Sequence, residues 1–303
     1  MKETRHVIIA SITSVIFLAV LLFPVNAQNG QQPQAIRMAM TKTLVTDLPE
    51  VLIDIALDEF KGVMKKTTGL PGEVTAKFSP GESAEKLQNK ELDFALLFAH
   101  EYAWAQKKYP GLRPFLIAAT KKKDKRAHII VHKDGVAKTF ADLRGKKLDL
   151  PLGSKEYCRI YLDKLSADKN PKGPADFFGS IVKSPSQLDA LDEVARGKAD
   201  ATVIDTPWLD FYKDVKGAVF AKNLRVLQQS AVVPPAVIVY TPGALEAATV
   251  NQVRDGLLKA HTDARGRALM ALWHIDAFEA VPEDFAESLA EVLKAYPPPI
   301  SPR

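Results

Sequence analysis

The stretch Ser186–Asp205, SQLDALDEVARGKADATVID, contains a helix signal followed at once by a strand signal. Ser186 and Asp189 have the spacing of an N-terminal helix cap, and apolar residues recur after them at helical spacing. Gly197 ends the helical pattern. The apolar run Ala199–Ile204 is typical of a strand buried on both faces. A helix that leads directly into such a strand predicts an α/β fold.

The same alternation continues on both sides of this stretch. Ile36–Met40 and Asp93–Phe98 are expected strands toward the N-terminus, and Leu224–Gln228 and Ala236–Tyr240 are expected strands toward the C-terminus. After these strands the pattern becomes almost wholly helical. Asp47 is expected to cap a helix of the N-terminal part, with a glutamate three residues later.

We therefore predict an α/β protein of two doubly wound lobes joined by two crossing segments. Lobe 1 is expected to comprise residues 28–124 and 233–303, and lobe 2 residues 125–232. The charge run Lys121–Arg126, KKKDKR, is typical of a solvated loop and marks the first crossing, although a patch for an anionic partner is the alternative. The second crossing is expected near Gln229–Pro235.

Residues 1–27 have the pattern of a secretory signal peptide. Lys2 and Arg5 precede the apolar run Val7–Phe23, and small residues at Val25 and Ala27 predict cleavage after Ala27. The alternative is an uncleaved anchor helix. An exported protein without a later apolar run of membrane length is expected in the periplasm.

Composition excludes several classes of protein. The 303 residues include 41 Lys and Arg against 36 Asp and Glu, so the net charge of +5 is too small and too dispersed to predict a nucleic-acid partner. The single cysteine, Cys158, cannot form an internal disulfide or a cysteine-rich metal site. His128 and His132 are four positions apart in an expected strand, about 13 Å, which is too far for one ion, so no metal site is predicted.

Catalytic motifs are absent as well. The chain has no G-x-S-x-G nucleophile motif and no phosphate-binding G-x-x-x-x-G-K-[ST] loop. The remaining enzyme hypothesis uses Cys158, whose place in the first turn of a helix would lower its pKa, or Glu156 as the reactive group. Motif evidence favours a protein that is not an enzyme and needs no cofactor.

Four segments carry a family resemblance. Glu91–Leu97, Phe140–Lys147 (FADLRGKK), Ser186–Asp205 and Leu224–Pro234 match in order the motifs of periplasmic receptors. The chain resembles type II periplasmic solute-binding proteins, and its segment 139–285 is similar to the phosphate/phosphite/phosphonate-binding receptors of ABC transporters. The resemblance implies a monomer that closes two lobes over a small solute and delivers it to an ABC permease in the inner membrane. A partner that senses the ligand for a membrane receptor is the other non-enzymatic alternative.

The resemblance places the solute at loops that follow strand ends and face the cleft. Hydroxyls and helix-start N–H groups at Ser154 and Ser186 are expected to bind an anion, although both serines can instead be plain helix caps. Lys155 would add positive charge, while Glu156 adds negative charge. Asp205 is expected to pair with Lys155 or to bind a ligand ammonium. The candidate ligand contacts are Thr41, Lys42, Thr43, His100, Tyr102, Ser154, Lys155, Tyr157, Ser184, Ser186, Asp205 and Thr206.

Overall fold

The computed structural model describes residues 34–121, 124–167 and 173–299. The expected signal peptide, residues 1–27, lies outside the described residues. Within those three ranges, no helix is both long enough and apolar enough to cross a membrane.

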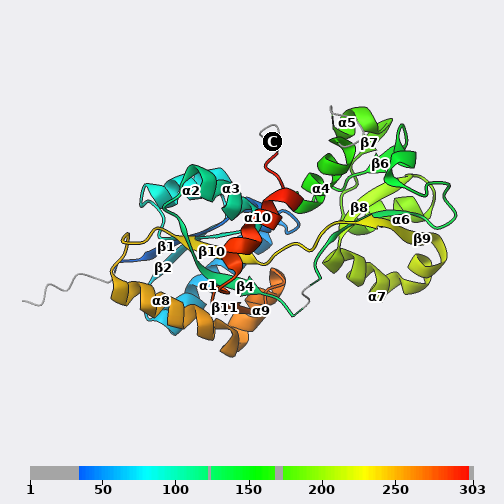
Figure 1. Ribbon diagram of the computed structural model, residues 1–303. Coiled ribbons are helices and arrows are strands. Elements are labelled where there is room, and N and C mark those ends of the chain that lie inside the picture. Colours follow the sequence, from blue (N-terminus) through cyan, green and yellow to red (C-terminus); the bar gives the residue numbers. More distant parts are fainter. Residues whose placement is uncertain (1–33, 122–123, 168–172, 300–303) are drawn as a thin grey trace, which may run out of the picture. The chain divides into compact units, whose positions relative to one another are not determined.

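The first of two mixed sheets has six strands in the order β11-β4-β10-β3-β1-β2 (Figure 1). Strands β1, β2 and β3 pair in parallel, whereas β10 is antiparallel to both β3 and β4, and β11 is antiparallel to β4. The bounds are Ile36–Met40 (β1), Gly72–Thr75 (β2), Phe94–Leu97 (β3), Arg113–Ala119 (β4), Ala236–Tyr240 (β10) and Ala277–Glu279 (β11).

The second sheet has five strands in the order β7-β6-β8-β5-β9. Strand β6 is parallel to β7 and β8, and β5 is antiparallel to β8 and β9. The bounds are Ala127–His132 (β5), Lys147–Asp149 (β6), Ser180–Val182 (β7), Ala201–Asp205 (β8) and Leu224–Gln229 (β9). The α/β prediction is confirmed. Both sheets are mixed, because a strand next to a crossing enters each sheet in the opposite direction.

Helices cover both faces of the first sheet. One face packs on α1, α8 and α9, and the other packs on α2, α3 and α10 (Figure 1). The bounds are Glu50–Thr68 (α1), Pro80–Gln88 (α2), Ala99–Lys108 (α3), Ala247–Lys259 (α8), Ala264–Leu272 (α9) and Phe285–Ala295 (α10), with 3-10 turns at Lys42–Leu44 (η1) and Ala260–Thr262 (η3). The C-terminal helices therefore return to the sheet that the N-terminal strands begin.

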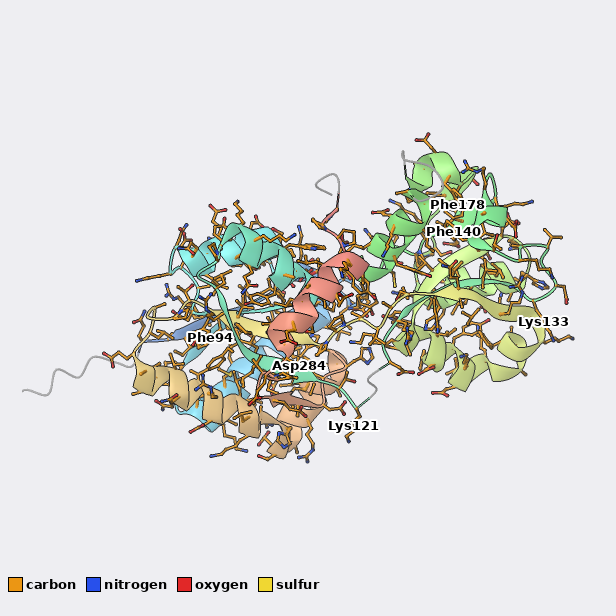
Figure 2. The ribbon with its side chains drawn as sticks, viewed as in Figure 1. Phe94, Lys121, Lys133, Phe140, Phe178 and Asp284 are labelled. Carbon is orange, nitrogen blue, oxygen red and sulfur yellow. The ribbon has the colours of Figure 1, made fainter. Side chains whose placement is uncertain are left out.

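The second sheet is also covered on both faces. Helices α6 and α7 bury one face, and α4 and α5 lie with the other. Phe140 and Phe178 pack edge to face there, with ring centroids 5.9 Å apart (Figure 2). The bounds are Phe140–Leu143 (η2), Glu156–Ala167 (α4), Pro174–Phe177 (α5), Gln187–Ala195 (α6) and Thr206–Asn223 (α7).

The chain passes twice between the sheets. It leaves the first sheet after Ala119 and enters the second at Ala127, and it returns between Gln229 and Ala236. Ser230 ties the two passages together, because its Oγ accepts a hydrogen bond of 3.0 Å from the N–H of Ala127.

Candidate solute-binding site

The carboxyl ends of the parallel strands in the two sheets meet. Phe98, which follows β3, lies edge to face against Tyr157 of α4, with ring centroids 5.5 Å apart. Lys155, which precedes α4, donates through Nζ to the carbonyl oxygen of Leu44 at 2.8 Å. Ligands of open α/β sheets bind outside the carboxyl ends of the strands, so this contact zone is the candidate site.

A cavity of about 40 Å³ lies in this zone, and we call it the inner cavity. Both sheets and both crossings contribute to its wall. Its lining includes Leu44, Phe98 and Ala118 from the first sheet, Lys155, Tyr157 and Asp205 from the second, and Lys125, Val233 and Pro235 from the crossings.

Tyr157 and Asp205 are two polar residues in the lining of the inner cavity, and they are hydrogen-bonded to each other. The Tyr157 hydroxyl donates to Oδ2 of Asp205 at 2.6 Å, and the N–H of Trp208 donates to Oδ1 at 3.2 Å, so Asp205 also caps α7. Burial raises the pKa of Asp205, while the bond from Tyr157 opposes that rise. Burial and the neighbouring carboxylate raise the pKa of Tyr157 well above its usual value, which keeps the phenol protonated as a donor.

Lys125 is the cavity residue that the sequence patterns missed. It belongs to the charge run expected to be a solvated loop, yet its side chain lines the inner cavity from the first crossing. Burial lowers its pKa, and the nearby carboxylates of Asp205 and Asp47 oppose the fall. The position of the charge run Lys121–Arg126 at a crossing could have indicated this role, because a segment that passes between two sheets borders the space between them.

Lys155 and Asp47 join the two sheets directly. The Lys155 ammonium pairs with the Asp47 carboxylate, and both side chains are less than 10% exposed. Trp208 adds a longer bond of 3.4 Å from Nε1 to Oδ2 of Asp47. The expectation that Asp47 caps α1 is wrong. Pro49 occupies the cap position, and the Asp47 carboxylate faces Lys155 instead.

Ser154 is 4% exposed, and its Oγ has no hydrogen-bond partner among the described residues. It lies two residues before α4, whose first N–H groups have no acceptor within the helix. An unsatisfied buried hydroxyl beside a helix start is a donor available to an anion.

The other two predicted serines are engaged within the protein. Ser186 caps α6 by accepting from the N–H of Asp189 at 3.2 Å, and its hydroxyl donates to the Asp189 carboxylate at 2.7 Å. Ser184 donates through Oγ to the buried carboxylate of Asp149 at 2.5 Å. Ser154 therefore differs from Ser184 and Ser186, because its hydroxyl alone among these three has no hydrogen-bond partner in the described part of the chain.

The predicted threonines of the first sheet hold a buried carboxyl group. Thr43 donates to Oε1 of Glu101 at 2.5 Å, and Thr41 donates to Oε2 at 3.2 Å. The N–H of Phe98 donates to the same Oε2 at 3.0 Å. Burial nevertheless raises the pKa of Glu101 to about 7. Lys42, between the two threonines, is exposed.

His100 and Tyr102 of α3 lie within the packed interior. His100 is fully buried and stacks on Phe98 with ring centroids 5.4 Å apart, and burial lowers its pKa to about 3. Tyr102 packs on Phe285 of α10 with ring centroids 6.2 Å apart, on the face of the first sheet that α2, α3 and α10 cover. Neither residue belongs to the lining of the inner cavity.

Thr206 holds the first crossing in place. Its Oγ1 accepts from the N–H of Arg126 at 2.9 Å and lies 3.0 Å from Nε2 of His128. Burial lowers the pKa of His128 to about 4, so this histidine is a neutral packed residue.

The thiol of Cys158 does not suit a nucleophile. It is 1% exposed, and burial raises its pKa well above the usual value, so the expected lowering by the helix start does not occur. In the described part of the chain, no group of three or more His, Cys, Asp or Glu side chains is placed to hold a metal ion.

Solved structures with the same fold come from several bacteria. A binding-protein component of an ABC phosphonate transporter from Pseudomonas aeruginosa is 16% identical, with a TM-score of 0.61 over 86% of this chain and 85% of that one. PhnD1 from Prochlorococcus marinus, solved with methylphosphonate, is 10% identical, with a TM-score of 0.62 over 86% of this chain and 98% of that one. A Xanthomonas citri protein bound to ATP is 18% identical, with a TM-score of 0.59 over 86% and 96%.

Sequence comparison identifies the family. No curated protein matches the chain. The family model for the periplasmic substrate-binding protein of phosphonate ABC transporters matches residues 44–285. Members of this family are binding proteins and not enzymes; they take a small-molecule ligand and work with a membrane permease. The chain belongs to the family of periplasmic substrate-binding proteins of phosphonate ABC transporters.

Proposed function

We propose that this protein captures a small anionic solute, of phosphonate or phosphate type, in the inner cavity and delivers it to its permease. The observation that carries the proposal is the Lys125 ammonium in the wall of a cavity between the carboxyl ends of two sheets. Ser154 is not in the lining of the inner cavity, but it directly precedes Lys155, which is, so its unpartnered hydroxyl and the start of α4 are the nearest further donors.

Asp205 adds a requirement that the solute must meet. Its oxygens accept from Tyr157 and Trp208, so it is partly satisfied, and its carboxyl group also lines the cavity as an acceptor. A solute with an anionic head and a hydrogen-bond donor fits both groups, since the donor faces Asp205 while the anion faces Lys125. A singly protonated phosphonate or an aminophosphonate has this combination.

The proposal includes the route and the motion. Residues 1–27 direct export to the periplasm and are cleaved, and the mature protein is a monomer. Residues 28–124 with 233–303 form one lobe and 125–232 the other, and they close by a hinge movement at the two crossings. Solute binding shifts an existing equilibrium between open and closed forms.

A titration of wild type and Lys125→Met against phosphate, phosphite, sulfate and methylphosphonate tests the proposal. A ligand stabilises the folded state by mass action, so at least one phosphorus oxyanion is expected to raise the thermal midpoint. Lys125→Met should then lower its affinity by about ten-fold or more, which is about 1.4 kcal/mol.

Lys133→Met is the matched control, because Lys133 is an exposed lysine at the end of β5 (Figure 2). It should bind as wild type does. No stabilisation by any of the four anions, or an equal loss in both lysine variants, contradicts the proposed function.

A further inference from the structure

A groove of about 640 Å³ lies between α7 and α9, beside the first crossing, and we call it the α7–α9 groove. Pro207 and Phe211 line it from α7, and Arg267 and Ala271 line it from α9. Its volume is in the usual range of small-molecule pockets.

The α7–α9 groove shares part of its wall with the inner cavity. Thr120, Lys125, Pro207, His274 and Ile275 line both spaces. His274 has a left-handed backbone with φ of 55°, which turns the chain just after α9 and leaves this residue at the junction. A solute whose head lies beside Lys125 therefore has the groove directly next to it.

The inner cavity and the α7–α9 groove differ in size, so they suit different parts of a solute. The inner cavity of about 40 Å³ holds on the order of a few water molecules, which suits an oxyanion head group alone. On the side of Asp47 the sheets are joined by the Lys155 ion pair and by the close approach of Gly153, where an added Cβ would lie 3.4 Å from Cα of Asp47. The α7–α9 groove therefore has room for a substituent of the solute, whereas the side next to Asp47 does not.

The chemistry of the groove favours a planar apolar substituent. Phe211 is 47% exposed and meets Trp208 edge to face at 5.8 Å, so one face of its ring is available for stacking. Pro207 and Ile275 extend the apolar wall. Aromatic pairs of this kind contribute energy beyond the apolar area that they bury.

Charges along the groove balance. Lys121, labelled in Figure 2, has its ammonium 4.0 Å from Oδ1 of Asp276, and its backbone N–H donates to Oδ2 of the same carboxylate at 2.7 Å. Arg267 donates to the carbonyl oxygens of His261 and Thr262. In the groove lining, the three basic residues Lys121, Lys125 and Arg267 are matched in number by the three acidic residues Asp210, Asp214 and Asp276. A balanced wall gives no net attraction for a second charge, so an uncharged substituent fits best.

We propose that the α7–α9 groove is a subsite for the organic part of the solute and that it selects phosphonates with an aryl substituent over methylphosphonate. The inference rests on the proposed function, since the anionic head must lie in the inner cavity. The subsite then sets specificity, while Lys125 and Ser154 set the requirement for an anion.

Calorimetric titration with phenylphosphonate and methylphosphonate tests the subsite in wild type, Phe211→Ala and Phe211→Leu. Wild type should bind phenylphosphonate about ten-fold more tightly, given the apolar area that a phenyl ring buries. Phe211→Ala should remove most of that preference and leave methylphosphonate affinity within about two-fold, and Phe211→Leu should keep part of it.

Val215→Ala is the matched control, because Val215 is 54% exposed one turn further along α7 and does not line the groove. It should keep the wild-type preference. Equal affinity for the two phosphonates, or an equal loss of both in Phe211→Ala, overturns the subsite and leaves the receptor proposal intact. Failure of both phosphonates to bind wild type overturns the proposed function and the subsite with it.

Discussion

Ser154 and Ser186 share one local pattern, a serine before a helix, and the structure gives them different roles. Ser186 caps α6 within its own turn, whereas Ser154 leaves its hydroxyl buried and unpartnered among the described residues. Local spacing predicts a cap wherever a serine precedes a helix, because a cap needs only near neighbours. It cannot predict which serine hydroxyl is left buried without a partner, because that depends on distant segments.

Separate alanine substitutions distinguish the two serines. Ser154→Ala should weaken methylphosphonate binding by about ten-fold, because a donor to an anion is lost. Ser186→Ala should leave affinity within about two-fold and lower the free energy of unfolding by about 1 kcal/mol, because a cap is lost. Calorimetric titration and urea denaturation measure the two effects. A larger loss of affinity in Ser186→Ala would contradict this assignment.

Glu101 should make stability depend on pH. Its pKa is about 7 in the folded protein against an ordinary value of 4.5, chiefly because of burial. The folded state therefore binds the proton more tightly than the unfolded state. This contribution is fully present below pH 4.5 and is lost as the pH rises through 7, and it amounts to about 3 kcal/mol.

Glu101→Gln should remove that loss, since a neutral amide does not titrate. Urea denaturation at pH 5 and pH 8 should show a smaller difference in unfolding free energy for Glu101→Gln than for wild type. Exposed Glu287→Gln on α10 serves as the control and should follow wild type. Identical pH dependence in all three proteins would show that Glu101 is ionised in the folded state over this range.

At the scale of elements, the stretch Ser186–Asp205 correctly predicted a helix followed by a strand. The expected helix and strand of Ser186–Asp205 are α6, Gln187–Ala195, and β8, Ala201–Asp205. Asp47 was not predictable in this way. Its partner Lys155 is 108 residues away, and a pattern that covers one helical turn carries no information about so distant a contact.

The Asp47–Lys155 pair should be strongly coupled. Removing either partner leaves a buried charge, so Asp47→Asn and Lys155→Met should each lower the free energy of unfolding by about 3 kcal/mol. The double variant should lose less than the sum by more than about 1 kcal/mol. Urea denaturation of the four proteins gives the coupling.

The exposed pair Asp58–Lys61 of α1, with a distance of 2.7 Å, provides the comparison. The same cycle there should give a coupling below about 1 kcal/mol, since water screens exposed charges. Simple additivity at Asp47 and Lys155 would mean that the pair does not join the two sheets in solution.

For the whole molecule, the sequence predicted an α/β fold and the family, and both are confirmed. Strand order was out of reach, because β5 and β10 enter each sheet beside strands that are far away in the chain. The same limit applied to the site. Three of the candidate residues, Lys155, Tyr157 and Asp205, border the inner cavity, but which residues do so depends on how two sheets meet. Lys125 does, and Tyr102 does not.

The proposed capture of a solute requires that the two proposed lobes close over it. Spin labels at Glu59→Cys on α1 and Lys198→Cys after α6 would place one probe beside each sheet, at exposed positions. Cys158 is buried and protonated, so it should not react with the label.

Pulsed electron spin resonance on the labelled protein, with and without saturating methylphosphonate, measures the distance between the two probes directly. We predict that the solute shifts the distribution to one shorter and narrower peak. An unchanged distribution, under conditions where calorimetry shows the solute bound, would contradict closure between the lobes.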